Sequence, residues 1–238
     1  MVGAAVHREG RGEARAAGWT HRVPLRLMLL EQGRISEEQL RQAGRRPADR
    51  EREAAELEEW LLHSGVLGEA ALTRAISAQW NCPVFSLSAT RPAEVAAAIP
   101  GFLAEALGAL PVAVAGGRLL YLAFAQGIDR SLSYAVEHMT GLRVASGIAR
   151  ESEFRREQAR FLAGRLPRAR FLEARDRSAL AQKMADWIEE ERPIDARLAR
   201  VHEQWWLRIW RREEPATVLP ACEAVEDLLA IVSEACHN

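Results

Sequence analysis

The feature that most constrains this fold is an apolar pattern that occurs twice near the N-terminus. The first stripe of apolar residues at helical spacing ends at Gly33, and the second ends at Gly65, 32 positions later. A glycine just past the last apolar residue of a stripe is typical of a helix C-terminus, and each glycine is followed by a second amphipathic segment. The sequence therefore predicts two tandem helical hairpins that pair their apolar faces into a small bundle.

The segment that follows Gly33 carries a signal for the start of a helix. Ser36 stands three residues before Gln39, and this spacing is typical of a capping box. In such a box the hydroxyl and the amide each satisfy a backbone N–H that has no partner within the helix. The first hairpin is therefore expected to consist of a helix, a glycine turn and a capped helix.

The middle of the chain combines strand and helix patterns. A short apolar run covers residues 82–87, and two longer apolar runs flank Gly116 and Gly117. The glycine pair predicts a β-hairpin, because a two-residue primed turn requires positive φ. Residues 142–148 are expected to form a third strand, and residues 151–162 a helix. Together these patterns predict a small three-stranded β unit with helices.

The last quarter of the chain shows apolar residues at helical spacing, which predicts helices over residues 179–190, 193–212 and 221–235. The second of these would carry an unusual cluster of Trp and Arg. We interpret the cluster first as a wide apolar face packed on the domain. The alternatives are a partner-docking face, since Trp and Arg dominate interface hot spots, and a helix at a membrane surface. The cluster consists of Trp205, Trp206, Arg208, Trp210 and Arg211.

These patterns predict an α+β fold that is mostly helical, with tandem helical hairpins, a small three-stranded β unit and a helical C-terminal extension. The expected segments are a mobile tail at 1–22, the hairpin repeat at 23–80, an α+β subdomain at 81–164 and the extension at 165–238.

Charge and cysteine content exclude several classes of protein. The 32 basic and 33 acidic residues give a net charge of −1, so nothing suggests a nucleic-acid polymer as partner. The three cysteines are odd in number and far apart, and the six histidines are scattered, so we expect neither a disulfide scaffold nor a metal site. Without a long apolar run or a signal peptide, we expect a cytoplasmic protein that reaches a membrane at most peripherally.

No phosphate-loop pattern GxxxxGK[ST] and no catalytic grouping stands out in the sequence. We therefore expect a protein that is not an enzyme. An enzyme whose catalytic residues are assembled from distant positions is the alternative.

The order of these segments resembles a known family, the N-terminal domain of type II secretion ATPases and its cyclic-di-GMP-binding variant in type IV pilus ATPases, the MshEN domain. The resemblance covers residues 24–163 without an ATPase domain. It is carried by LLEQGRISEEQL at 29–40, Ile99-Pro100, LPV at 110–112, GRLL at 117–120 and TGLRV at 140–144. Domains of this type also occur attached to bacterial membrane glycosyltransferases.

The resemblance implies that cyclic-di-GMP would bind to the repeat, with leucines as an apolar bed, glycines that let the backbone come close, and a glutamine that contacts guanine. The matching positions are Leu29, Leu30, Gly33, Leu40, Leu61, Leu62, Gly65, Leu72 and Gln79. The family motif begins Arg-Leu-Gly, where this chain has Pro-Leu-Arg at 24–26 and Glu-Leu-Glu at 56–58. Pro47 stands where the first copy would have its glutamine.

The expected function is therefore regulation or docking for a membrane-associated bacterial machine, with a secretion or pilus component or a glycosyltransferase as protein partner. Cyclic-di-GMP is the one candidate ligand, and no cofactor is expected. The departures from the motif leave a ligand-free structural adaptor as the alternative. In that case the partner would bind through the C-terminal Trp and Arg cluster.

Overall fold

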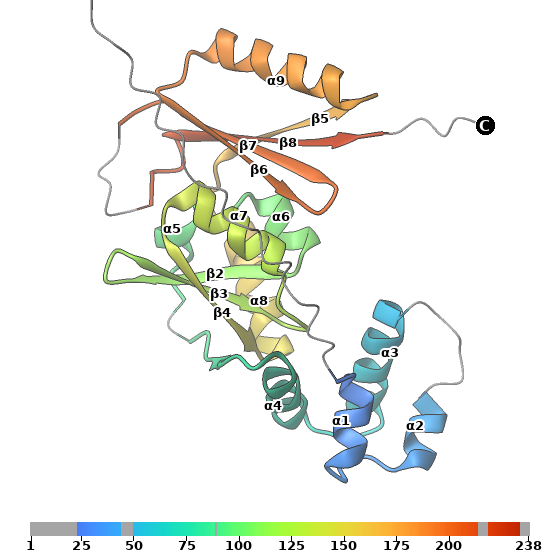
Figure 1. Ribbon diagram of the computed structural model, residues 1–238. Helices are drawn as coiled ribbons and strands as arrows, with labels where there is room; N and C mark the ends of the chain where they lie inside the picture. The colour runs from blue at the N-terminus through green and yellow to red at the C-terminus, as the bar shows by residue number, and fades with distance from the viewer. Residues whose placement is uncertain (1–22, 44–49, 89, 214–218, 234–238) are drawn as a thin grey trace, which may run out of the picture.

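The computed structural model describes residues 23–43, 50–88, 90–213 and 219–233. Within these residues, three parts follow one another along the chain: a bundle of helices, a four-stranded sheet with helices around it, and a second four-stranded sheet covered by a helix (Figure 1). The predicted α+β class is confirmed. The tail predicted at 1–22, together with Pro47 and Cys236, lies outside the described residues.

The N-terminal bundle has the predicted form of two helical hairpins. Gly33 and Gly65 end the first helix of each hairpin in the left-handed region, with φ of 65° and 70°. Glycine adopts this region without the steric cost that a Cβ would bring. The four helices are α1 (Leu25–Glu31), α2 (Glu37–Ala43), α3 (Arg50–His63) and α4 (Glu69–Trp80).

The predicted capping box is confirmed at the start of α2. The N–H of Ser36 donates to Gln39 Oε1 at 2.8 Å, and the N–H of Gln39 donates to Ser36 Oγ at 3.2 Å. Each side chain thus satisfies one backbone donor at the helix start, which fixes where α2 begins.

The first sheet has the strand order β1-β4-β3-β2, with β1 and β3 both parallel to β4. Four strands form where the sequence predicted three. The additional strand is β1, whose two residues pair with Ile148 and Ala149 at the end of β4. It lies within the short apolar run at 82–87, but two residues are too few for a strand period to define it as a strand of the sheet. The strands are β1 (Val84–Phe85), β2 (Ala109–Ala115), β3 (Leu119–Phe124) and β4 (Arg143–Ala149).

The hairpin predicted at the glycine pair is confirmed between β2 and β3. Gly116 and Gly117 have φ of 56° and 64°, and the N–H of Arg118 donates to Ala115 O at 3.2 Å. A turn with two consecutive positive φ values has a backbone twist that matches the right-handed twist of the two strands it joins.

After the bundle, four further helices pack around the first sheet, and the helix predicted over 151–162 is among them. The side chain of Asp129 caps α7 by accepting from the N–H of Leu132 at 2.9 Å, and Gly141 ends that helix with φ of 71°. The helices are α5 (Pro92–Val95), α6 (Gly101–Ala106), α7 (Arg130–Thr140) and α8 (Glu151–Leu162).

The prediction of a helical C-terminal extension is wrong. Only α9 (Arg177–Glu191) is helical among its described residues, as expected for 179–190, and the rest forms a sheet of order β5-β8-β7-β6. Strand β5 is parallel to β8, while β7 is antiparallel to both β8 and β6. The strands are β5 (Arg168–Ala174), β6 (Asp195–Val201), β7 (Gln204–Trp210) and β8 (Val225–Val232).

A turn without glycine explains why the hairpin of β6 and β7 was predicted as a helix. Val201 pairs with Gln204, so the connection consists of His202 and Glu203, and His202 adopts φ of 53°. The residues expected in such turns are Gly, Asn and Asp. Without that signal, the apolar positions of 193–212 fit a helical period as well as a strand period.

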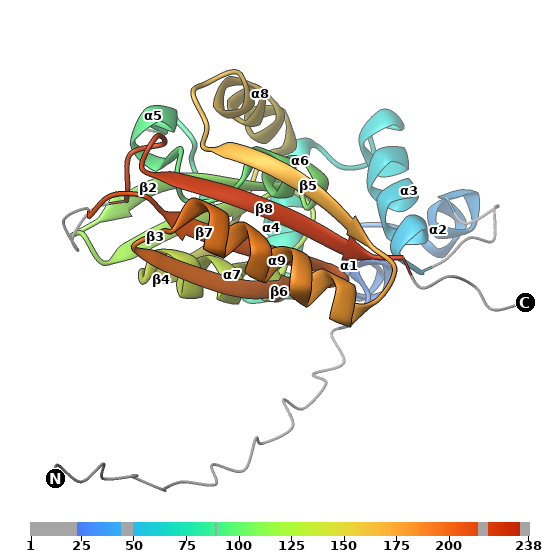
Figure 2. The ribbon, with the colours of Figure 1, turned by 90° about the horizontal axis from the view of Figure 1, so that it is seen from above.

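The second sheet is buried on both faces at its two central strands, β7 and β8. One face packs on α9 through Leu180, Met184, Leu207, Leu228 and Ala230, and Figure 2 shows α9 lying over the sheet. The other face joins the core of the first unit through Val201, Trp206 and Leu229. The two sheets and the helices between them therefore share one continuous core.

Strand β6 is fixed to α7 at both ends of that helix. Arg197 on β6 donates to the carbonyls of His138 and Met139 at the C-terminal end of α7, at 3.1 and 3.2 Å. At the other end, His202 Nε2 lies 2.5 Å from Oδ2 of the capping residue Asp129. A cation near the last carbonyls and a carboxylate near the first N–H groups are both favourable for a helix.

Candidate functional site

A cavity of about 480 Å³ lies where the second hairpin meets the first α+β unit. Its wall comes from three places in the sequence: the last turns of α3 with the start of α4, the segment after β3, and the start of α8. The lining residues are Glu58, Glu59, Leu62, His63, Glu69, Gln126, Glu151, Ser152 and Arg155. The volume is within the range of small-molecule pockets, and four of the nine side chains are carboxylic acids.

Glu58 is the most unusual residue of this wall. Its side chain lies on α3 and the residue is only 7% exposed. Burial, and to a smaller extent the charge of Glu151, raises the pKa of the Glu58 carboxyl from its ordinary value of 4.5 to about 8. Glu58 is therefore mostly protonated at neutral pH, and it is the residue found where the family motif has a glycine.

The start of α8 holds two of the other acidic groups, Glu69 and Glu151, in place. Glu69 accepts hydrogen bonds from the backbone N–H and the hydroxyl of Ser152, at 2.6 and 2.8 Å. Arg155 forms an ion pair with Glu151 one helical turn away. The contact between Glu69 and Ser152 joins α4 to α8, so the cavity spans the junction between the hairpin repeat and the α+β unit.

The leucines implied by the family resemblance mostly face the interior. Leu29, Leu61 and Leu72 are buried in the core of the bundle, while Leu30, Leu40 and Leu62 are partly buried and pack against it. Leu29 and Leu61 thus have equivalent environments, as do Leu30 and Leu62, whereas Leu72 is more buried than Leu40. Of the six, Leu62 also lines the cavity.

The two glycines and the glutamine lie on the outside of the bundle. A Cβ added at Gly33 or Gly65 would have no other atom within 4 Å, so both turns are open to an approaching molecule. Gln79 lies near the end of α4, and its amide donates to the carbonyl oxygen of Val23 at 2.9 Å. The end of the second copy therefore contacts the start of the first.

The Trp and Arg cluster lies on strand β7 and just after it, not on a helix. Trp206 and Arg208 have 0% exposure, so the interpretation of these two as partner-docking residues is wrong, and the interpretation as a packed face fits them. Trp205 and Trp210 are partly buried, each beneath an arginine of β6, Arg200 at 5.7 Å and Arg197 at 4.8 Å from the ring centres.

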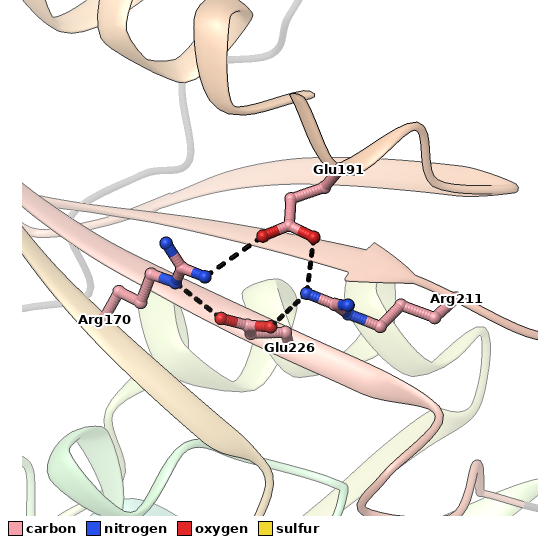
Figure 3. Close-up of polar contacts among 4 residues, drawn as sticks. All are labelled: Arg170, Glu191, Arg211 and Glu226. Carbon is pink, nitrogen blue, oxygen red and sulfur yellow. Dashed lines mark hydrogen bonds and ion pairs between the residues drawn. The ribbon is translucent and has the colours of Figure 1, made fainter. Parts of the chain in front are cut away.

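Arg211, the last residue of that cluster, belongs to a ring of four alternating charges at one end of the second sheet (Figure 3). Arg170 lies 2.6 Å from Glu226 and 3.0 Å from Glu191, and Arg211 lies 2.6 Å from each of the same two carboxylates. Because each charge has two opposite neighbours, the ring joins β5, β8 and the end of α9. We interpret it as a structural contact rather than a binding site.

Metal-binding clusters and membrane-spanning helices are both absent from the part of the chain that the structure describes. No group of three or more His, Cys, Asp or Glu side chains there has a geometry that could hold a metal ion. Among the same residues, no helix is both long and apolar enough to cross a membrane.

Sequence reasoning did not find the cavity. Glu58 stood out only as a departure from the motif, and nothing marked Glu151, Ser152 or Arg155, which come from a helix more than 80 positions further along the chain. The signal that could have directed attention there is an acidic residue within the apolar stripe of a predicted helix, because a buried acid requires either a partner or a raised pKa.

No protein-family model and no curated protein matches this chain. Among solved structures, the chain is similar to MshE with cdg (cyclic-di-GMP), with 27% identity over 59% of this chain and 99% of that chain, and a TM-score of 0.42. It is also similar to the N-terminal domain of XpsE, with 20% identity over 58% of this chain and 93% of that chain, and a TM-score of 0.43.

Proposed function

We propose that this chain is a non-catalytic regulatory or docking module for a membrane-associated bacterial machine of the secretion, pilus or polysaccharide-synthesis type. The hairpin repeat would be its sensing part, with cyclic-di-GMP as the candidate ligand. One observation carries the proposal: the two hairpins repeat each other's geometry, with exposed glycine turns and with Gln79 at the seam between the copies. These are the positions that the family resemblance marks for the ligand.

Helix α4 is placed to transmit a change in the repeat. It packs against α1 on one side and against β1 and β4 on the other. Its last residue, Trp80, lies against Gly127, where an added Cβ would be 2.6 Å from the indole. A ligand or partner that prefers one angle between the hairpins would shift the population of that angle, and α4 would carry the shift to the α+β unit.

Calorimetric titration of the full chain with cyclic-di-GMP tests the proposal. We expect micromolar binding that weakens in Gln79→Leu, which removes the amide from the seam. Gln182→Leu is the matched control, because Gln182 is an exposed residue of α9 far from the repeat in sequence. If Gln79→Leu and Gln182→Leu bound cyclic-di-GMP with equal affinity, the ligand would bind at a site that does not include Gln79.

A ligand-free adaptor is the second candidate, and two observations favour it. The Gln79 amide already has a partner in Val23. Glu58, which stands where the motif has a glycine, lies in a wall with three further acids, Glu59, Glu69 and Glu151, which would repel a dianionic ligand. Absence of heat at millimolar cyclic-di-GMP would support the adaptor and reject the sensor.

A further inference from the structure

Glu58 is the most buried acid in the wall of this cavity. Its carboxyl makes no hydrogen bond and no ion pair among the residues that the structure describes, although the residue is more than nine-tenths buried. Burying a polar group without a partner is costly, and such groups in folded proteins usually have an explanation. Here the side chain lines the cavity, so a bound molecule could supply the missing partner.

The charges around Glu58 define the kind of molecule. The cavity wall contains four carboxyl groups, one guanidinium and one imidazole, contributed by Glu58, Glu59, Glu69, Glu151, Arg155 and His63. The guanidinium is already paired with Glu151, and the partners of Glu69 are the neutral N–H and hydroxyl of Ser152. The wall therefore carries an excess of negative charge, which a cation would complement.

The spacing of the acidic groups favours an organic cation over a metal ion. A metal ion needs several ligands converging on one point, and no such group exists among the described residues. The carboxyl groups instead lie around a volume of about 480 Å³, beside the aliphatic side chain of Leu62. This arrangement suits a flexible chain with several separated positive charges and methylene groups between them.

We propose that this cavity binds a small aliphatic polyammonium ion, with Glu58 accepting hydrogen bonds from one of its ammonium groups. Binding would ionise Glu58: the carboxyl O–H bond breaks, its proton leaves to solvent, and the carboxylate pairs with the ammonium, which keeps its own protons. The inference does not depend on cyclic-di-GMP binding, because it concerns a different ligand of opposite charge.

Titration calorimetry of the full chain with spermidine at pH 7 and fixed ionic strength tests this site. We expect Glu58→Gln, which keeps the shape of the side chain but cannot ionise, to weaken binding at least about tenfold. Glu105→Gln is the control, because Glu105 is an exposed acid on α6 that does not line the cavity. Circular dichroism of each variant checks that it is folded.

A second readout separates a specific site from diffuse attraction. The same titration in buffers of different ionisation enthalpy should show release of about one proton per bound spermidine at pH 7 in the wild type, and none in Glu58→Gln. Equal affinity of the wild type and Glu58→Gln would overturn the proposal. The proposal would also be overturned if the protein bound Mg²⁺ and Glu58→Gln weakened that binding as much as it weakened spermidine binding, since the site would then be a metal site.

Discussion

Arg208 and Asp227 form an ion pair in which neither side chain has any exposed surface. Arg208 Nε lies 2.7 Å from Oδ1 of Asp227 and Nη2 lies 2.8 Å from Oδ2, while Nη1 donates to the carbonyl of Ala97 at 2.5 Å. The indole N–H of Trp206 donates to the same carboxylate at 2.7 Å. The hydrogen bond from Arg208 to Ala97 joins the second sheet to the segment between α5 and α6.

Removing one charge of this pair should destabilise the protein strongly. We expect Arg208→Met to lower the free energy of unfolding by about 3–5 kcal/mol, because it leaves the carboxylate of Asp227 buried without its counter-ion. Urea unfolding followed by circular dichroism measures the change. Arg91→Met, in the exposed pair with Glu94, is the control and should cost less than about 1 kcal/mol. A loss of similar size in both variants would contradict the role given to Arg208.

The pH dependence of stability should report on Glu58. Its pKa is about 8 in the folded protein and ordinarily 4.5, so its contribution to stability is fully present below pH 4.5. As pH rises towards 8, the unfolded chain ionises first and stability falls, by up to about 1.4 kcal/mol per pH unit. Glu58→Gln should remove this part of the slope and be more stable than the wild type at pH 8. Parallel curves for both proteins from urea unfolding between pH 5 and 8 would contradict the raised pKa.

The glycine at the second hairpin turn should tolerate no side chain. Gly65→Ala places a Cβ on a residue with φ of 70°, which should cost about 1–2 kcal/mol even though the surrounding space is open. Gly68→Ala, three residues away with φ of −76° and equally open space, is the control without backbone strain. It should cost less than Gly65→Ala, since it only replaces one uncharged N-cap residue of α4 by a poorer one. Thermal unfolding of the two variants distinguishes backbone strain from lost contacts.

The contact between Trp80 and Gly127 should decide how firmly α4 is docked. Gly127→Ala would place a Cβ 2.6 Å from the indole, so Trp80 has to move away from the first sheet. We expect faster amide hydrogen exchange in α4 of this variant, while exchange in β7 and β8 stays unchanged. Unchanged exchange in α4 would show that the helix is held mainly by its other contacts.

Local signals predicted much of the fold. The capping box of Ser36 and Gln39, the turn at Gly116 and Gly117, and α8 form as predicted, because neighbouring residues decide each of them. The repeat was found in the same way, since Gly33 and Gly65 mark equivalent turns.

The second sheet and the cavity depend on contacts that are distant in sequence. Burial of Arg208 is tolerable only because Asp227, 19 positions later, lies beside it on the next strand. The neighbours of Arg208 in sequence give no sign of that carboxylate, which is why partner docking stood as an alternative to a packed face for this cluster. In the same way, the environment of Glu58 depends on Glu151, which only the folded chain brings near.

The position of β8 has a consequence for the order in which the chain can fold during synthesis. This strand lies between β5 and β7, yet it is the last of the four to leave the ribosome, and Val225 comes 51 positions after Ala174. Until then β5 lacks the strand it pairs with, and α9 lacks Leu228 and Ala230, which complete the core beneath it. The helical bundle and the first sheet can form while translation continues, but the second sheet has to wait for its central strand.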